Sequence, residues 1–290
     1  MPHPVKKITL ARRVVQAIML VVFCLPPLLA GWGIFGLFSH ADDQLPTPAE
    51  GVFYGSLSSS SVGGITLFDP LGALEVFVAS GGLEITALVG ALTVLVIYGL
   101  VRARAFCGWV CPVNFIGEGV DALRRRLGIS LPERVIPRRT KVGVAVAFVA
   151  LSALLGYPVF EAISPIAAVN KGLVFGALAG VGTFIAIVVA EVFFCRRVWC
   201  RTLCPLGGVY QVVGKVGQVN VAIDRDKCIH CNRCKEVCLA DPVILDPALA
   251  GEDVIVRAGD CMACGACVDT CPTGALHFRL GRPAKPGAKA

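Results

Sequence analysis

The chain has 290 residues, of which 56% are hydrophobic and only 16% are charged, whereas an ordinary soluble domain carries about 25% charged residues. This composition excludes a disordered chain, a collagen-like fibre and a small disulfide-stapled secreted module, and it favours a membrane protein. The formal net charge of +7 and the 14 cysteines are also unusual, and their meaning depends on where they lie along the chain.

Four segments are apolar enough to be membrane spans, which require about 20 consecutive apolar residues. They cover about residues 14–38, 83–101, 142–160 and 173–194. The first ends beside Ser39-His40-Ala41, a small-residue sequence similar to a signal-peptide cleavage site, but its apolar run of about 25 residues is longer than a signal core. We therefore predict four transmembrane helices, the first of them an uncleaved anchor.

Basic residues are confined almost entirely to one side of these segments. Short cytoplasmic loops of membrane proteins collect Lys and Arg. Of the 27 basic residues, 26 precede the first segment, lie between the second and third, or follow the fourth, and only Lys171 lies in a loop on the opposite side. This distribution predicts a multi-pass protein of the bacterial cytoplasmic (inner) membrane with both termini in the cytoplasm. It also explains the positive charge without a nucleic-acid partner.

Two cysteine pairs with the pattern C-x3-C-P follow the second and fourth segments. The four thiols are those of Cys107, Cys111, Cys200 and Cys204. The units that contain them begin with Asp69-Pro70-Leu71 and Ser164-Pro165-Ile166, so the chain is internally duplicated. We predict a pseudo-symmetric four-helix bundle, built from a duplicated two-helix unit, that brings both pairs near one axis. The thiols then form either one shared metal or iron–sulfur site, which the complete set of four favours, or reversible disulfides.

The C-terminal part carries two copies of the pattern C-x2-C-x2-C-x3-C, starting at Cys228 and Cys261. In this pattern three cysteines bind one 4Fe-4S cluster and the fourth binds the neighbouring cluster. We assign cluster one to Cys228, Cys231, Cys234 and Cys271, and cluster two to Cys238, Cys261, Cys264 and Cys267. Leu239 stands where proline commonly follows the first motif, which predicts an altered turn with the cluster retained.

The predicted fold class is a membrane α-helical bundle with a small α+β ferredoxin domain. Residues 1–217 form the four-span membrane domain, residues 218–280 the ferredoxin domain with two 4Fe-4S clusters, and residues 281–290 a flexible tail. No haem is expected, because all four histidines lie outside the spans. Cys24 and Cys195 lie outside every motif, and we give them no role.

These features resemble the NapH/MauN family of ferredoxin-type membrane proteins. The resemblance rests above all on the stretches 106–112 and 199–207 and on Asp69-Pro70-Leu71. A NapH-like function is preferred. It implies the membrane component of a quinol dehydrogenase, a quinol-oxidising electron-transfer subunit of a larger complex. This subunit passes electrons from quinol to a NapG-like ferredoxin partner and a periplasmic reductase system.

The resemblance leaves three points open. A MauN-like role implies a maturation factor that supplies electrons for the assembly of a metal site or cofactor. The direction of electron flow is open, because the predicted clusters face the cytoplasm whereas the implied acceptor is periplasmic. The apolar stretch 65–78 has two interpretations: a membrane surface beside a quinone headgroup, or a packed cap over the helices.

Overall fold

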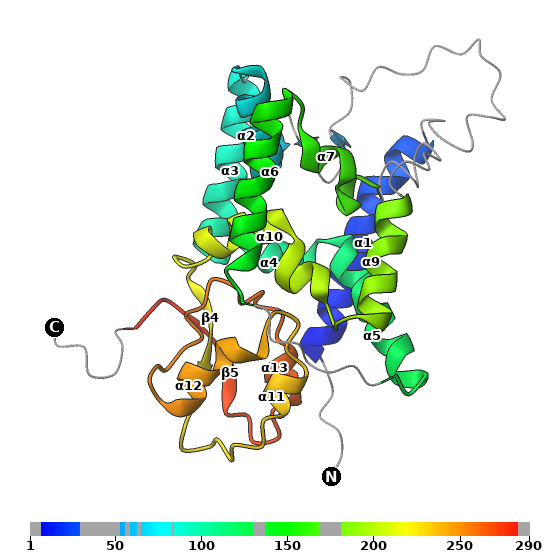
Figure 1. Ribbon diagram of the computed structural model, residues 1–290. Coiled ribbons are helices and arrows are strands. Elements are labelled where there is room, and N and C mark those ends of the chain that lie inside the picture. The colour runs from blue at the N-terminus through cyan, green and yellow to red at the C-terminus, as the bar shows by residue number, and fades with distance from the viewer. Residues whose placement is uncertain are drawn as a thin grey trace.

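The computed structural model describes residues 7–29, 53–55, 59–62, 65–82, 84–129, 137–168 and 181–283. They form a helical part and a smaller α+β part, which lies below it in Figure 1. Several sequence predictions fall outside the described residues. These are the end of the first predicted span (30–38), the start of the fourth (173–180), the signal-like Ser39-His40-Ala41, and the tail from residue 284 onward.

The helical part combines apolar helices with one small sheet. Strands β1, β2 and β3 pair antiparallel in that order, with Ser59 opposite Phe68, and β3 lies against α3. The apolar stretch 65–78 therefore forms β3 and most of α2, which contact α3 and α6. In chain order the elements are α1 (Lys7–Leu29), β1 (Phe53–Gly55), β2 (Ser59–Val62), β3 (Ile65–Phe68), α2 (Pro70–Ser80), α3 (Ile85–Val101), α4 (Ala105–Trp109), α5 (Pro112–Arg126), α6 (Thr140–Leu155), α7 (Val159–Ile163), α9 (Val181–Phe193), the π-helical turn η4 (Trp199–Leu203) and α10 (Pro205–Val213).

Local sequence explains the ends of these helices. The Asp69 carboxylate accepts a hydrogen bond from the Leu71 N–H at the start of α2, as an N-cap residue does. Gly81 and Gly156 end α2 and α6 in the left-handed conformation, with φ of 69° and 64°, which glycine adopts without strain.

Helix α3 lies within the segment predicted as the second span (83–101). Helix α6 begins two residues before the segment predicted as the third span (142–160). Among the helices that the structure describes, none combines the length and the apolarity needed to cross a bilayer.

The two halves of the predicted repeat share one local structure. In each, the first cysteine lies in a short helical turn, α4 or η4. The second cysteine directly precedes a longer helix, α5 or α10, which starts at Pro112 or Pro205. Proline is favoured at the first helical position, because its missing N–H has no intrahelical partner there. The C-x3-C-P pattern therefore encodes a turn followed by a helix start.

The α+β part is built around two strands. β4 (Val219–Ile223) and β5 (Leu276–Leu280) pair antiparallel, with Val221 opposite Phe278. The chain between them forms four short helices: α11 (Arg233–Glu236), the 3-10 turn η5 (Pro242–Leu245), α12 (Asp246–Ala250) and α13 (Ala266–Thr270). A small core beneath these elements includes the buried side chains of Val221, Ile244, Leu245, Val256 and Met262.

A buried arginine at the end of α3 joins the two parts. The guanidinium of Arg102 donates to the side-chain oxygen of Asn220 and to the carbonyl oxygens of Val256, at 2.8 Å, and Ala258, at 2.6 Å. The side chain of Arg102 is fully buried, and a buried charge requires such partners. The α+β part is therefore fixed to the helical part by specific polar contacts.

Gly208 lies where α10 crosses α6. A Cβ at this position would lie 2.4 Å from the carbonyl oxygen of Lys141, a distance that real Cβ atoms essentially never show. We expect Gly208→Ala to lower the free energy of unfolding by about 1–3 kcal/mol, the usual cost of overpacking.

Gly143→Ala on α6 is the matched control, because a Cβ there would meet no atom within 4 Å. Alanine also favours a helix more than glycine does, so stability should be unchanged or higher. Denaturant unfolding of both variants measures the difference, and equal stabilities would contradict the close crossing.

Candidate metal centres

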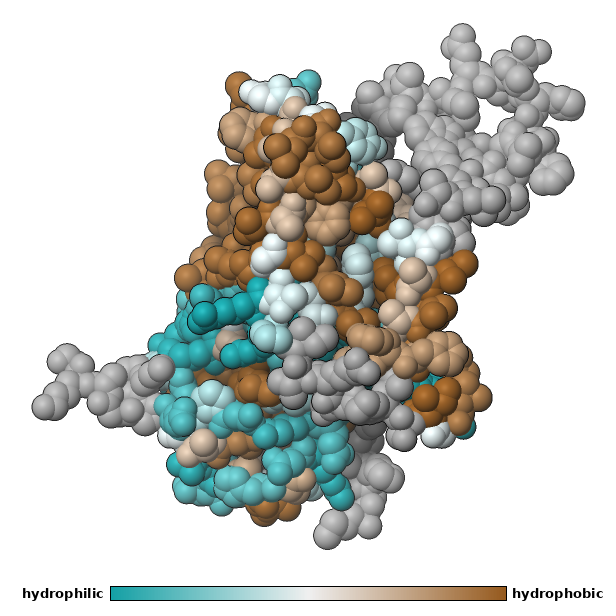
Figure 2. All heavy atoms as spheres, in the orientation of Figure 1, coloured by the Kyte–Doolittle hydropathy of each residue, from teal (hydrophilic) through white to brown (hydrophobic). Residues whose placement is uncertain are grey.

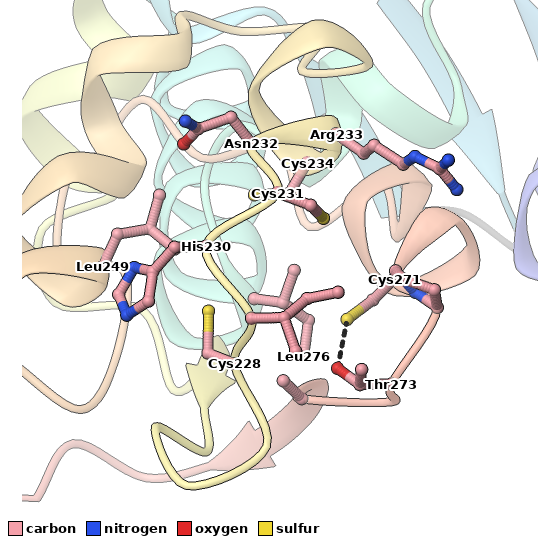
Figure 3. Close-up of a pocket in the computed structure, with 13 residues that line it drawn as sticks. Cys228, His230, Cys231, Asn232, Arg233, Cys234, Leu249, Cys271, Thr273 and Leu276 are labelled. Atoms are coloured by element: carbon pink, nitrogen blue, oxygen red, sulfur yellow. Dashed lines mark hydrogen bonds between the residues drawn. The ribbon is translucent and has the colours of Figure 1, made fainter.

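The first cavity lies at the surface of the α+β part. It is lined by Cys228, Cys231, Cys234 and Cys271, the four cysteines assigned to cluster one. Figure 3 shows them around one space: Cys228 and Cys231 come from the loop that leads into α11, Cys234 from α11 itself, and Cys271 from the chain after α13. His230 and Asn232, between these cysteines, have left-handed backbone with φ of 52° and 58°. These two residues bend the loop around the cavity.

The second cavity lies deeper, against the core of the α+β part. It is lined by Cys238, Cys261, Cys264 and Cys267, and otherwise mostly by apolar side chains. Burial raises the pKa of the Cys238 thiol to about 12. Each of these two cavities therefore combines three cysteines of one motif with the last cysteine of the other.

The third cavity lies in the helical part and joins the two halves of the repeat. All four cysteines of the C-x3-C-P motifs line it: Cys107, Cys111, Cys200 and Cys204. Cys111 and Cys204 are the N-cap residues of α5 and α10, and the Cys204 sulfur accepts a hydrogen bond from the Gly207 N–H at 3.4 Å. Two helix N-termini, the positive ends of helix dipoles, therefore lie at this cavity.

The chemistry of these donor sets fits a group bound by four thiolates. Burial and the neighbouring Cys107 raise the pKa of Cys204 to about 12, so the thiol is neutral until a metal displaces its proton. The 13 cysteines from Cys107 to Cys271 are free thiols. In the described part of the chain, no three His, Cys, Asp or Glu side chains lie close enough together to bind a single metal ion directly.

Buried cations lie beside the third cavity. Arg104, which lines it, donates to the carbonyl oxygen of Cys200 at 2.9 Å and to the Asp260 carboxylate at 3.1 Å. Arg197 is fully buried and donates to the Asp121 carboxylate at 2.9 Å. A cation close to a thiolate-ligated group offsets its negative charge, so these arginines suit an anionic occupant.

The second and third cavities are direct neighbours. A Cβ at Gly108, within the first C-x3-C-P motif, would lie 2.9 Å from the carbonyl oxygen of Met262 and 3.6 Å from the Cβ of Cys264. The adjacent Trp109 donates its indole N–H to the carbonyl oxygen of Ala263 at 3.0 Å. The cysteine loop of the α+β part therefore rests on the cysteine turn of the helical part.

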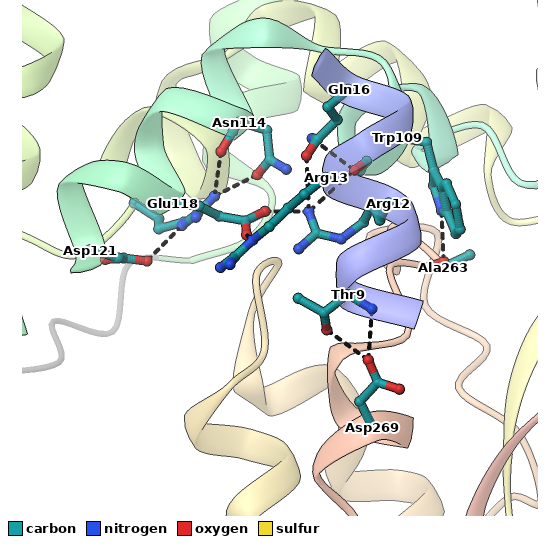
Figure 4. Close-up of polar contacts among 12 residues, drawn as sticks. Thr9, Arg12, Arg13, Gln16, Trp109, Asn114, Glu118, Asp121, Ala263 and Asp269 are labelled. Atoms are coloured by element: carbon teal, nitrogen blue, oxygen red, sulfur yellow. Dashed lines mark hydrogen bonds and ion pairs between the residues drawn. The ribbon is translucent and has the colours of Figure 1, made fainter. Parts of the chain in front are cut away.

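Helix α1 supports this junction with buried polar contacts, which Figure 4 shows. Arg12 donates to Glu118 on α5 and to the carbonyl oxygen of Gly108, the latter at 3.3 Å. Gln16 donates to the same carbonyl at 2.9 Å. The side chains of Arg12 and Gln16 are each 1% exposed. Their hydrogen bonds to the Gly108 carbonyl therefore stabilise the turn that carries Cys107.

Sequence reasoning missed these supporting residues. It interpreted every arginine as an orientation signal, whereas Arg12, Arg102, Arg104 and Arg197 are buried and paired. One signal could have indicated their role. Basic residues stand a few positions before each C-x3-C-P motif, in both halves of the repeat.

Two families of known domains match the chain. One, described as a 4Fe-4S binding domain, matches twice, at residues 83–130 and 177–223. The other, described as a 4Fe-4S dicluster domain, matches residues 220–272. The double match covers the two C-x3-C-P units and supports their duplication. Together with the cysteine cavities, these matches define an iron–sulfur protein of the ferredoxin type.

Several ferredoxin-type proteins named MauN and NapH are similar to this chain over most of its length. The methylamine utilization ferredoxin-type protein MauN of Methylorubrum extorquens is 33% identical over 278 residues, 95% of this chain and 90% of the relative. Ferredoxin-type protein NapH of Escherichia coli is 34% identical over 223 residues, 76% of this chain and 77% of NapH. MauN of Paracoccus denitrificans is 34% identical over 254 residues, 87% and 83% of the two chains.

The chain therefore belongs to the family of ferredoxin-type proteins that contains NapH and MauN. This membership confirms the resemblance carried by the cysteine motifs, and it makes iron–sulfur electron transfer the function class of the protein. No solved structure matches the chain.

Proposed function

We propose that the protein is the membrane component of a quinol dehydrogenase, a subunit that oxidises quinol and passes electrons toward a NapG-like ferredoxin partner and a periplasmic reductase system. The observation that carries this proposal is the succession of three four-cysteine cavities from the helical part into the ferredoxin part. The third cavity contacts the second through Gly108 and Met262. Electrons from a lipid-soluble quinol reach a protein acceptor through a series of neighbouring one-electron carriers, and iron–sulfur clusters in these cavities would form such a series.

Within this proposal, the eight ferredoxin cysteines hold two 4Fe-4S clusters. Cluster one is bound by Cys228, Cys231, Cys234 and Cys271, and cluster two by Cys238, Cys261, Cys264 and Cys267. Each bound cluster supplies one-electron transfer. The apolar walls of the second cavity exclude water, whereas Cys231 and the neighbouring Ile229, which is 63% exposed, leave the first cavity at the surface. The partner protein therefore docks beside the first cavity.

For the C-x3-C-P cysteines we propose a third iron–sulfur site, in preference to a reversible disulfide. The double variant Cys107→Ser with Cys200→Ser should lose iron, yet keep the roughly eight iron atoms of the two ferredoxin clusters. Cys195→Ser is the matched control, because Cys195 is also buried but lines none of the three cysteine cavities. Iron analysis after anaerobic purification measures both. Unchanged iron in the double variant would rule out the third site and favour the thiol pair.

We further propose that the helical part lies in the bacterial cytoplasmic membrane, with the ferredoxin part and both termini in the cytoplasm. Large apolar side chains stand exposed on its helices, among them Ile85 at 78%, Leu154 at 82% and Phe193 at 71%. Figure 2 shows a largely apolar surface over the helices and a hydrophilic one over the ferredoxin part. Exposed apolar surface of this extent marks an interaction with membrane or protein. A protease should remove a C-terminal tag only from inside-out vesicles.

The decisive experiment for the proposed function is anaerobic reduction of the purified full chain by a quinol analogue. Electron paramagnetic resonance should then show the signal of reduced clusters. A protein that keeps its iron, is reduced by dithionite and is not reduced by quinol would contradict the proposal.

A second candidate function is that of a maturation factor, which supplies electrons for the assembly of a metal site or cofactor on a partner enzyme. The match to MauN of Methylorubrum extorquens favours it, because it covers 95% of this chain against 76% for NapH of Escherichia coli. Deletion of the gene separates the two functions. If the partner enzyme stays inactive even with an artificial electron donor, the protein acts in maturation; if the donor restores activity, it acts in electron delivery.

A further inference from the structure

A separate cavity of about 240 Å³ lies in the helical part. Its wall is mostly apolar and includes Met19 of α1, Leu67 of β3, Val94 of α3 and Leu206 of α10. An apolar cavity of about 150 Å³ already holds a benzene molecule. This cavity therefore admits a planar headgroup of one or two rings.

A few polar side chains reach the same cavity, and two of them are related by the internal repeat. Asp69 and Ser164 each stand directly before the proline that starts their unit, and both line the cavity. The Asp69 carboxylate uses one oxygen to cap α2, and a carboxylate can accept further hydrogen bonds. Apolar walls with a few convergent polar groups are typical of small-molecule sites. These two repeat-related residues supply a carboxyl and a hydroxyl, and the hydroxyl-bearing Ser60, Tyr98 and Tyr210 also line the cavity.

This cavity adjoins the four-cysteine cavity of the helical part. Phe106, Ile166 and Leu206 line both, and Phe106 directly precedes Cys107. The ring of Phe106 packs edge-on against Tyr210 with a centroid distance of 5.8 Å. A ligand in the large cavity is thus separated from the cysteine site by single side chains.

We propose that this cavity binds the aromatic headgroup of the quinol, with the Asp69 carboxylate accepting a hydrogen bond from one ring hydroxyl and the Ser164 hydroxyl contacting the other ring oxygen. The inference rests on the proposed function and assigns the place of its substrate. A quinol matches the wall because its ring is apolar and its two hydroxyls are donors, which the Asp69 carboxylate can accept in addition to the Leu71 N–H. A purely hydrocarbon lipid offers no donor to Asp69.

The charge state of Asp69 makes the predicted binding depend on pH. Burial, together with the smaller effect of the nearby carboxyl groups of Glu161 and Glu75, raises the pKa of Asp69 to about 7. Tyr210 and Cys204 also face this group; burial raises the pKa of Tyr210 well above this range, so it stays neutral, whereas Cys204 belongs to the four-cysteine set of the neighbouring cavity. The carboxylate, which accepts the hydrogen bond, forms as the pH rises through about 7. Quinol binding should therefore strengthen with rising pH in this range.

The test is binding of heptyl-hydroxyquinoline N-oxide, a fluorescent and redox-inert quinol analogue, to the detergent-purified full chain. Asp69→Asn keeps the helix cap but removes the charged acceptor, and should weaken binding about tenfold or more. Val94→Phe fills the cavity and should weaken it at least as much. The matched controls are Asp224→Asn in the ferredoxin part and Val96→Phe. Val96 is 50% exposed and lies two residues from Val94 on the same helix.

Iron content equal to that of the unmodified chain shows that each variant is folded, so affinity can be compared directly. Weaker binding in Asp69→Asn and Val94→Phe alone supports the site. Equal affinity in all four variants, or no binding to the unmodified chain, overturns it. The proposed function fails separately: if the chain binds the analogue at this cavity but its clusters are not reduced by quinol, the site stands and the quinol dehydrogenase does not.

Discussion

Replacing Cys264 by serine is expected to remove about four iron atoms per chain, and with them one of the two ferredoxin clusters. Cys264 lines the second cavity with three other cysteines, and the rest of that wall is mostly apolar. A serine hydroxyl there binds iron more weakly than a thiolate and has no polar partner in the wall. Metal binding contributes directly to folding, so the variant should also unfold at a lower temperature.

The crossed arrangement of the motifs makes this prediction sharper. Cys238 belongs to the first motif in the sequence, yet it lines the second cavity with Cys264. Cys238→Ser and Cys264→Ser should therefore abolish the same paramagnetic signal, whereas Cys271→Ser should abolish the other one. Cys195→Ser controls for the loss of a buried thiol and should keep both signals. Loss of different signals in the first two variants would contradict the crossed ligand sets.

Asp260→Ala is expected to loosen the attachment of the ferredoxin part and to lower the free energy of unfolding by about 3–5 kcal/mol, the usual cost of breaking a buried ion pair from one side. The carboxylate of Asp260 pairs with Arg104 at 3.1 Å and also with Lys141. Each of the three side chains is 1% exposed, so the variant leaves two cations buried without their anion. Denaturant unfolding and limited proteolysis around residues 214–218 measure the effect.

A rescue variant distinguishes the effect of the unpaired buried cations from the effect of losing the Asp260 side chain itself. Combining Asp260→Ala with Arg104→Met and Lys141→Met removes the stranded cations, and apolar replacement of a buried ionic group is often neutral. Stability should return in part. The control is Asp224→Asn, because Asp224 pairs with Lys227 at 2.8 Å on the exposed surface and such pairs contribute little. A loss in Asp260→Ala no greater than in this control would show that the buried cluster does not hold the two parts together.

The features predicted well from sequence are those encoded locally. The C-x2-C-x2-C-x3-C spacing places three sulfurs within one loop, so it predicts three members of each four-cysteine set directly. The C-x3-C-P repeat predicted that two distant pairs meet, and the structure lines one cavity with all four cysteines. The apolar segment 83–101 contains α3, and the segment 142–160 contains most of α6 and, after a turn at 156–158, the start of α7.

The features that sequence did not predict depend on partners far away in the chain. Arg102 and Asn220 are 118 positions apart, and Arg12 and Glu118 are 106 positions apart. Nothing in the local pattern of either residue specifies its partner, since a lysine or arginine near an apolar segment equally well marks orientation. The large cavity could not be predicted from sequence for the same reason. Its wall is formed by single side chains from elements throughout the helical part.

The N-terminal end of α1 has a consequence for how the chain is made. Its cap is supplied by Asp269, whose carboxylate accepts hydrogen bonds from the Thr9 N–H at 2.7 Å and the Thr9 hydroxyl at 2.8 Å. Asp269 lies between Cys267 and Cys271, one from each ferredoxin set. The residue that caps α1 lies 260 positions further along the chain and is therefore translated long after the helix itself. The same short segment that carries one cysteine of each ferredoxin set therefore also closes the N-terminal end of α1.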